Sequence, residues 1–259
     1  TNLSVKHSYS LSKYRHFPEK PRPMPRAKSG LNVAEFLRNS KVFGSLPGDA
    51  IASLAKNALV ERYAVRTLIH PAGQGVQRLW LVVAGHVELI SQLAGGDEVE
   101  LSDVMPGHGI PWLACIGSSV PVYDLWSSPH ACLIALPALQ VRAVCEQHPA
   151  IYQRILVEVG ERMSYLLEWT TQSVLLKPEQ RLAKLLHVLA RSRGLDGVSA
   201  ILPLTQSRLA RLAGCSRQSL SVLLKALKER GLVTGAYGEL RIASIHDLQS
   251  FIDAGPPNT

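Results

Sequence analysis

The stretch LTQSRLARLAGCSRQSLSVLLKALKERG, residues 204–231, decides the fold of the second half of the chain. Thr205 is a good N-cap for a short helix, and Gly214 then interrupts the helical pattern. Ser216 offers a second N-cap, before leucines that recur at i, i+3, i+4 and i+7. Gly231 supplies the C-terminal stop. Two short helices joined by a tight glycine turn predict a helix-turn-helix, whose second helix can enter the major groove of DNA.

The second helix carries polar and basic side chains away from its apolar face. They suit base edges and phosphates, and they are Arg217, Gln218, Ser221, Lys225 and Lys228. An ordinary helical hairpin with a solvated basic face would show the same periodicity, so that alternative stays open at this point.

The net charge of +8 is spread unevenly over the 259 residues. Residues 1–30 and residues 177–259 each carry a net charge of +6, whereas residues 31–176 carry −4. Basic ends around a neutral-to-acidic middle fit a nucleic-acid module joined to a part that does not bind nucleic acid.

The composition indicates a globular protein without a membrane partner. Hydrophobic residues make up 46% of the chain and charged residues 19%, as in soluble domains. No apolar run approaches the roughly 18 residues of a membrane helix, and the polar N-terminal segment shows no secretory signal. We therefore expect a cytoplasmic protein. The cysteines form no CxxC pair, which favours reduced, mostly buried thiols over a metal site: Cys115, Cys132, Cys145 and Cys215.

Residues 1–30 are rich in Ser, Lys, Arg and Pro, and they predict a disordered or extended basic arm. This arm is either a solvated tail or a segment that contacts DNA phosphates. Residues 31–148 are expected to form a sensor-like domain. Its short β-rich runs, separated by Gly, Pro and Asp turns, predict an antiparallel roll or barrel. The helices expected within it are 33–37, 50–59 and 137–147, and the clearest strands are 79–83, 86–90 and 99–102.

Residues 149–176 predict one long helix. Side chains at spacings of 3 and 4 form a coiled-coil-like seam, which favours a dimerisation helix over a plain core helix. The seam consists of Ile155, Val159, Arg162, Met163, Leu166 and Trp169. Further side chains make the stripe wide enough to face both the roll and a partner helix: Tyr152, Leu156, Met163 and Leu167.

Residues 177–255 are expected to form a winged helix-turn-helix domain. Pro178 begins its first helix. A turn at 235–238 between two short β runs predicts the wing, and Ser244 with Asp247 caps a last short helix. The predicted fold class is therefore α+β: an N-terminal antiparallel, jelly-roll-like β-roll, a long dimerisation helix and a C-terminal winged helix-turn-helix.

This order of elements resembles the CRP/FNR family of bacterial transcription regulators, over about residues 40–250. The sharpest match is LTQSRLARLAGCSRQSLSVLLKAL with its Gly-Cys-Ser-Arg turn. A second match, HPAGQGVQRLWLVVAGHVEL, is similar to the first hairpin of the family's cyclic-nucleotide-binding roll. The resemblance implies binding to double-stranded DNA as a homodimer on a palindromic site, with RNA polymerase as a candidate partner.

The resemblance also implies roles for single residues. Arg217 matches the arginine that reads guanine, because its fork donates to O6 and N7 together. Gln218 stands where many members have Glu, and Val222 where many have a second Arg, so we expect altered preference at the adjacent base pairs. Ser221 is the third expected base contact. The expected phosphate contacts are Thr205, Gln206, Ser207, Ser216, Ser219 and Lys225.

The roll departs from family members that bind a cyclic nucleotide. Residues 111–112 are Pro-Trp where those members have Gly-Glu, and residues 122–123 are Val-Tyr near their Arg-Ser/Thr pair. No Lys or Arg stands between Arg78 and Arg142, yet a buried phosphate needs a cation or a dense set of oriented amides. We therefore expect no binding of cAMP or cGMP.

Any effector pocket in the roll would suit an uncharged or apolar molecule, with Trp112, Tyr123 and Trp126 as its candidate lining. Trp112 as core filler, and a ligand-free roll kept for dimerisation and polymerase contact, are the alternatives. No metal or other cofactor is expected, because the histidines of the roll stand at no ligand spacing: His70, His86, His108 and His130.

The sequence thus predicts a homodimeric, sequence-specific transcription regulator that is not controlled by a cyclic nucleotide. It contains no nucleophile–base motif, metal spacing or P-loop, so it is not expected to be an enzyme. The alternative is a sensor or scaffold of the same fold that does bind cAMP or cGMP, or that has lost specific DNA binding.

Overall fold

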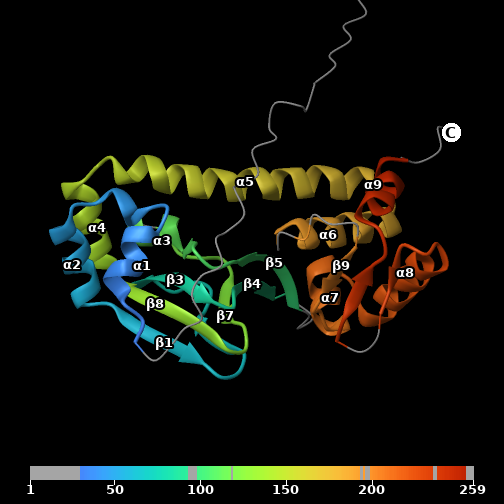
Figure 1. Cartoon of the computed structure of the whole chain (residues 1–259), viewed down its shortest axis with the longest axis horizontal. Helices are drawn as coiled ribbons and strands as arrows, with labels where there is room; N and C mark the ends of the chain where they lie inside the picture. Colours follow the sequence, from blue (N-terminus) through green and yellow to red (C-terminus); the bar gives the residue numbers. More distant parts are fainter. Residues whose placement is uncertain are drawn as a thin grey trace, which may run out of the picture.

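The computed structural model describes residues 30–92, 98–117, 119–192, 195, 199–235 and 238–254. It shows an antiparallel roll, a long helix that runs the length of the molecule, and a helix-turn-helix domain at the other end (Figure 1). The α+β fold class is confirmed. The predicted N-terminal arm falls on residues 1–29, which lie outside the described residues.

The roll contains two antiparallel four-stranded sheets, with strand orders β1-β8-β3-β6 and β2-β7-β4-β5. Their strands are β1 (Leu59–Tyr63), β2 (Thr67–His70), β3 (Arg78–Ala84), β4 (Val87–Gln92), β5 (Glu98–Val104), β6 (Gly109–Ile110), β7 (Asp124–Ser127) and β8 (Ala131–Pro137). Strand β5 is an edge strand, so one of its backbone edges is left for another element to cover.

Strand β3 is buried on both faces, because it separates two hydrophobic clusters. Leu79, Leu81 and Val83 pack into the cluster beneath the helices. Trp80 and Val82 point the other way, into the cluster between the sheets. This alternation is the period of two that a strand imposes on its side chains.

Short helices cover one end of the roll (Figure 1). They are α1 (Val33–Asn39), the 3-10 turn η2 (Phe43–Ser45), α2 (Gly48–Lys56), α3 (Trp112–Ile116) and α4 (Ala138–Gln147). The helix expected over 50–59 ends at Lys56, so its predicted end is wrong. Leu59 instead opens β1, where it pairs with Ala135 of β8, and the sheet ladder overrides the local helical pattern.

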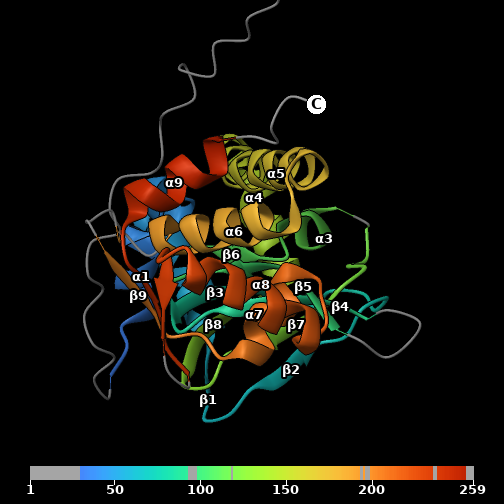
Figure 2. The ribbon, with the colours of Figure 1, turned by 90° about the vertical axis from the view of Figure 1, so that its right-hand side faces the viewer.

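Helix α5 (Ile151–Leu175) joins the two halves of the molecule. Ile155 belongs to the hydrophobic cluster of the roll, whereas Trp169 packs against the cluster of the C-terminal domain. The view along the molecule shows α5 above both parts (Figure 2). Within the described residues, no helix is both long enough and apolar enough to span a membrane.

The C-terminal domain folds around its own apolar cluster. Its elements are α6 (Pro178–Ser192), β9 (Ala200–Leu202), α7 (Gln206–Ala213), α8 (Arg217–Glu229), β10 (Val233–Thr234), β11 (Leu240–Ile242) and α9 (Ile245–Asp253). Strands β10 and β11 form the predicted wing, although two residues of its turn, 236 and 237, lie outside the described residues. Strand β9 joins the sheet next to β11 and was not expected from the sequence.

Candidate nucleic-acid interface

Both helices of the helix-turn-helix begin at the N-caps that the sequence predicts. The Thr205 hydroxyl accepts a hydrogen bond from the backbone N–H of Arg208 at 3.2 Å. The Ser216 hydroxyl does the same for the N–H of Ser219 at 3.1 Å. Between the helices Gly214 has φ +61°, the left-handed conformation that glycine adopts without a Cβ penalty.

Helix α8 separates an apolar face from a polar one. Leu220, Leu224 and Leu227 are buried in the domain core. The expected base-contact residues Arg217, Gln218 and Ser221 are all exposed. The structure thus brings these three side chains together on one solvent-facing surface at the start of α8, the part of a recognition helix that meets base edges.

The expected phosphate contacts surround this surface. Thr205, Gln206, Ser216, Ser219 and Lys225 are exposed, and Ser207 is half-buried. The caps use the acceptor oxygens of Thr205 and Ser216, but a hydroxyl can still donate its own hydrogen. Lys225 lies 3.8 Å from Glu229 and is 78% exposed, so solvent screens that ion pair. These placements are compatible with the predicted contacts, which stay predictions.

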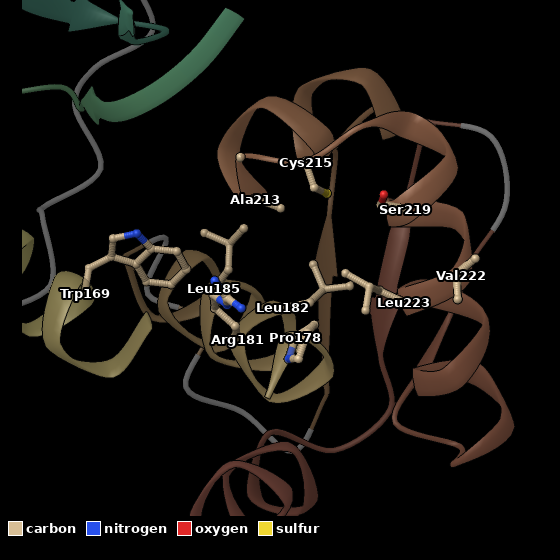
Figure 3. A pocket seen from close by; sticks show the side chains of 11 residues that line it. Trp169, Pro178, Arg181, Leu182, Leu185, Ala213, Cys215, Ser219, Val222 and Leu223 are labelled. Carbon is tan, nitrogen blue, oxygen red and sulfur yellow. The ribbon is translucent and has the colours of Figure 1, made fainter. Parts of the chain in front are cut away.

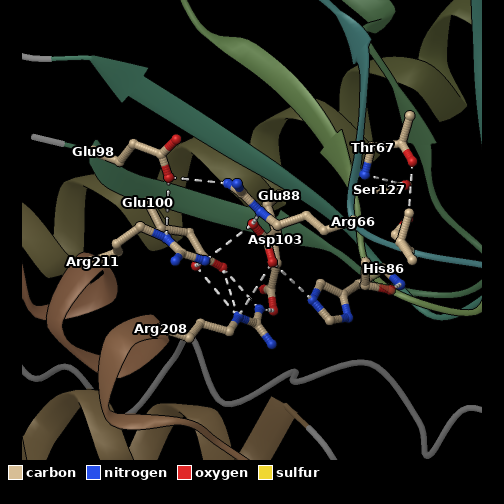
Figure 4. A network of polar contacts seen from close by, with 12 residues as sticks. Arg66, Thr67, His86, Glu88, Glu98, Glu100, Asp103, Ser127, Arg208 and Arg211 are labelled. Atoms are coloured by element: carbon tan, nitrogen blue, oxygen red, sulfur yellow. Dashed lines mark hydrogen bonds and ion pairs between the residues drawn. The ribbon is translucent and has the colours of Figure 1, made fainter. Parts of the chain in front are cut away.

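The structure also contains an ionic contact that the sequence reasoning missed. Arg208 of α7 binds the roll through Glu100 and Asp103 of β5 (Figure 4). Its Nη2 lies 2.8 Å from Glu100 Oε1 and 3.1 Å from Asp103 Oδ2. Its Nε donates to the same Glu100 carboxylate at 3.2 Å. This fork is the bidentate arrangement that makes Arg–carboxylate pairs strong and directional.

Arg211, one turn further along α7, extends this contact. Its Nη2 lies 3.4 Å from Glu88 of β4, and its Nε lies 3.6 Å from Glu98 of β5. Arg66 approaches the same two carboxylates from the roll, at 2.8 Å and 3.2 Å. We call these residues the interdomain clamp: Arg66, Glu88, Glu98, Glu100, Asp103, Arg208 and Arg211.

A bulge in β5 gives the clamp its geometry. Ile90 pairs with Glu100, but the next residue back along β4, Leu89, pairs with Ser102 rather than Leu101. The extra residue reverses the alternation of the strand, so Glu100 and Asp103 lie on the same face as Glu88. In the sequence the signal is only acids two apart at Glu98 and Glu100, and it does not reveal the bulge or its partner helix.

Comparisons with known proteins point to the same fold and function. Residues 180–251 match the Crp-like helix-turn-helix domain. The chain is 25% identical to the cAMP-activated global transcriptional regulator CRP of Escherichia coli O6:H1 over 178 residues, which cover 67% of this chain and 83% of that protein. It is 26% identical to the HTH-type transcriptional regulator Cmr of Mycobacterium tuberculosis over 210 residues, 80% of this chain and 82% of that one. The chain thus carries a Crp-like helix-turn-helix domain and is similar over most of its length to CRP-type transcription regulators.

A solved structure shows the same fold. The c-di-GMP responsive global regulator CLP of Xanthomonas campestris superimposes with a TM-score of 0.63 at 20% identity, over 76% of this chain and 99% of that one. CRP and Cmr are transcription regulators rather than enzymes.

The first part of the predicted seam on α5 packs against the roll. Ile155 is 1% exposed in the core of its own roll, and Val159 packs against the same core. Arg162 donates to the Gly109 carbonyl of the roll at 3.4 Å. Ile155 is buried within its own roll, so the seam prediction is wrong for this residue; Val159 and Arg162 are half-buried, and for them the seam stays a prediction. Of the other seam residues, Leu166 and Trp169 are half-buried and Met163 is 56% exposed.

An exposed apolar row runs beside the buried face of α5. It includes Leu156, 67% exposed, and Met163, with Leu167 further along at 57%. Gly160 lies between them on the same face. These positions recur at spacings of 4, 3 and 4, as in a coiled-coil seam shifted by one residue from the predicted one.

The three aromatic residues of the expected effector pocket lie in different surroundings. Trp112 is 1% exposed and packs against Phe43, with the ring centroids 5.6 Å apart and the rings tilted by 44°. Tyr123 packs against the cluster between the sheets. Trp126 carries the Arg66 guanidinium over its ring at 4.3 Å. Trp112 therefore serves as core filler, the alternative that the sequence left open.

A buried carboxylate from α5 lies beside Trp112. Glu158 accepts hydrogen bonds from the Gly109 N–H at 2.8 Å and from Trp112 Nε1 at 3.0 Å. His108 and Arg162 approach the same oxygen at 3.6 Å and 3.8 Å. Burial raises the pKa of Glu158, but the hydrogen bonds from His108 and Gly109 outweigh it and lower the pKa below its ordinary value. The roll thus holds a negative charge at its contact with α5.

A cavity of about 380 Å³ lies elsewhere, between α6 and the helix-turn-helix (Figure 3). Trp169, Pro178 and Leu223 form part of its mostly apolar wall, with Arg181 and Cys215 among the polar side chains. The candidate pocket residues of the roll do not line it. Among the described residues, no group of three or more His, Cys, Asp or Glu side chains could hold a metal ion.

Proposed function

We propose that this protein is a CRP/FNR regulator that binds a two-fold-symmetric DNA site as a homodimer and acts without a cyclic nucleotide. In this proposal residues 31–148 are the sensor-like roll, 149–176 the dimerisation helix and 177–255 the DNA-binding domain. The observation that carries it is the surface of α8, where Arg217, Gln218 and Ser221 are exposed on a firmly capped helix. RNA polymerase is the partner that this role implies.

The exposed row on α5 supports the homodimer. Leu156 and Met163 are more than half exposed, and an apolar helical row of this spacing is stabilised when a second helix covers it. The one partner that every molecule of this protein meets is a second copy. Two-fold symmetry about α5 would present two copies of α8 to successive major grooves.

Independence from cyclic nucleotides is supported by charge. A cyclic phosphate bound between the roll and α5 would face the buried Glu158 carboxylate. Arg162, the cation nearest to it, already binds Glu158 and the Gly109 carbonyl. Relatives with this architecture are named for different ligands, cAMP for CRP and c-di-GMP for CLP, so the fold alone does not specify an effector.

The test begins with selection of duplex DNA from a random pool by the full-length chain, followed by gel-shift titration of the selected duplex. We expect a specific complex at sub-micromolar protein that weakens steeply as salt rises, because binding releases counterions from the phosphates. No enrichment over random DNA would contradict the proposal and favour a scaffold that has lost specific DNA binding.

A further inference from the structure

Burial restricts the side chains of the clamp residues Arg208 and Arg211 to one arrangement. The Glu100 side chain is fully buried and that of Glu88 is 3% exposed, while Arg208 is 12% exposed. Burial lowers the pKa of Arg208, but the hydrogen bond to Glu100 and the charges of Glu100, Asp103 and Glu88 outweigh it and raise the pKa above its ordinary value. Buried, bidentate ion pairs are far less screened than surface pairs, and removing one partner leaves a charge without compensation.

The clamp joins two parts that the chain connects through a break in the helix. Helix α5 ends at Leu175 and α6 begins at Pro178, and proline at such a junction stops one helix and starts the next. Packing of α7 along β5 adds a second attachment through the ion pairs of the clamp (Figure 4). Two attachments restrict the rotation that one junction alone would allow.

The docked arrangement leaves the DNA-reading surface free. Arg217, Gln218 and Ser221 stay exposed, as do Thr205 and Gln206 at the start of α7. The four carboxylates of the clamp face three arginines, so little negative charge remains to repel DNA. The clamp therefore leaves the DNA-reading surface exposed while it orients the C-terminal domain.

We infer that Arg208 and Arg211 are positioning residues that set the half-site spacing this regulator accepts. The inference rests on the proposed function, because spacing has meaning only for a dimer on paired half-sites. With each domain clamped to its own roll, the two copies of α8 stand at one separation, and only half-sites at the matching spacing engage both. A C-terminal domain that rotated freely would accept several half-site spacings.

The test uses the full-length chain and the duplex selected by the wild-type protein. Three further duplexes carry one half-site alone, or both half-sites with the spacer lengthened or shortened by about 2 base pairs, a fraction of a helical turn. The variant is Glu100→Gln with Asp103→Asn, which neutralises both roll carboxylates that Arg208 binds. Neither residue belongs to the proposed DNA surface, so their loss removes no DNA contact.

We expect the wild type to prefer its own spacing by about tenfold or more, and the variant to lose most of that preference with unchanged affinity for the single half-site. Direct contact of Arg208 with DNA would instead give equal or tighter binding to every duplex, and that outcome overturns the inference, as does an unchanged spacing preference. Glu61→Gln is the matched control: it removes an ion pair with Arg78, at 2.7 Å, that lies within the roll.

Amide hydrogen exchange gives a readout without DNA. Exchange in β5 should speed up in the variant because α7 no longer covers this edge strand, while α8 keeps its protection. Unchanged protection of β5 overturns the clamp itself. If selection enriches no duplex, the proposed function fails and the inference falls with it; if a duplex is enriched but spacing preference survives in the variant, only the inference falls.

Discussion

Arg217 stands at the first position of α8, with its side chain in solvent and the helix behind it capped by Ser216. Its guanidinium can reach a base edge without losing any contact within the described structure. Gln218 and Val222 complete the same surface, and an amide and an isopropyl group read base edges differently from Glu and Arg. In the proposed function, sequence specificity therefore depends on the side chains exposed at the start of α8 rather than on the fold.

Arg217→Ala should abolish preference for the selected duplex over random DNA. We expect a loss of about 1–3 kcal/mol on the specific site, because a bidentate guanine contact is worth that much. Competition gel shifts against random duplex measure the difference. The control is Lys228→Ala, an exposed residue later in the same helix, which should weaken binding to all sequences alike. An equal loss on specific and random DNA from Arg217→Ala would contradict base reading.

Glu88 should make the free energy of unfolding depend on pH in the acidic range. Burial raises the pKa of Glu88, but the neighbouring His86, the hydrogen bond from Arg66 and the charge of Arg208 outweigh it and bring the pKa to about 2. Arg211 adds a further cation at 3.4 Å. Because the folded pKa lies below the unfolded value near 4.5, the contribution of Glu88 is fully present above about pH 4.5 and is lost as the pH falls towards 2.

Glu88→Gln should therefore lower the free energy of unfolding at neutral pH, by at most about 3 kcal/mol. The difference from wild type should shrink between pH 4.5 and 2, as measured by urea denaturation at a series of pH values. Glu98→Gln is the control from the same cluster: its side chain is 27% exposed, so solvent screens its charge and a smaller effect is expected. A difference that does not change with pH would contradict the assignment.

Helix α5 has a buried face and an exposed apolar row. Its buried face contributes Ile155 to the roll and Glu158 to the contact with Gly109 and Trp112. Its exposed row contains Leu156 and Met163. The two faces lie side by side on one helix, about 100° per residue apart, so a shift of one residue decides which side chains meet the roll and which remain for a partner.

Leu156→Glu combined with Met163→Glu should convert a dimer into a monomer, because two carboxylates would be placed in an apolar interface on each helix. Sedimentation or light scattering measures the mass. Ser164→Glu is the control, since it adds one carboxylate at an exposed position of α5 off the row. A variant with the mass of the wild-type dimer would show that the interface lies elsewhere.

The whole molecule combines a roll whose sequence has no Lys or Arg between Arg78 and Arg142 with a C-terminal domain docked on that roll. The charges that the chain separates by sequence meet in space: the acidic middle supplies Glu88 and Glu100, and the basic C-terminal part supplies Arg208. The uneven charge distribution therefore serves attachment within the molecule as well as attraction to DNA.

Addition of cAMP or cGMP should leave the thermal stability unchanged. A ligand that binds only the folded state raises the free energy of unfolding by RT ln(1 + [L]/Kd), and the melting temperature rises with it. At a ligand concentration about 100 times Kd the gain is ~2.7 kcal/mol. Differential scanning fluorimetry with each nucleotide measures this, and the selected duplex serves as a positive control. A rise of several degrees with either nucleotide would overturn the charge argument about Glu158 and the roll.

The sequence alone determined the elements that local rules govern. The caps Thr205 and Ser216, the left-handed turn at Gly214 and the leucine period of α8 are all encoded within a few residues of where they act, and each is present in the structure. The same holds for the wing and for Pro178 at the start of α6. The exposure of Arg217 also follows, because a helix that buries its leucines must turn its other side chains outward.

Only the tertiary structure decided which surfaces meet. The bulge in β5 that aligns Glu100 with Asp103, the docking of Arg208 across more than 100 residues of chain, and the face of α5 that the roll covers depend on contacts between distant segments. Sequence periodicity says that a face is apolar or charged, but it does not say what packs against it. That choice is made by the shape of the assembled core, so the clamp and the true exposed row of α5 become visible only in three dimensions.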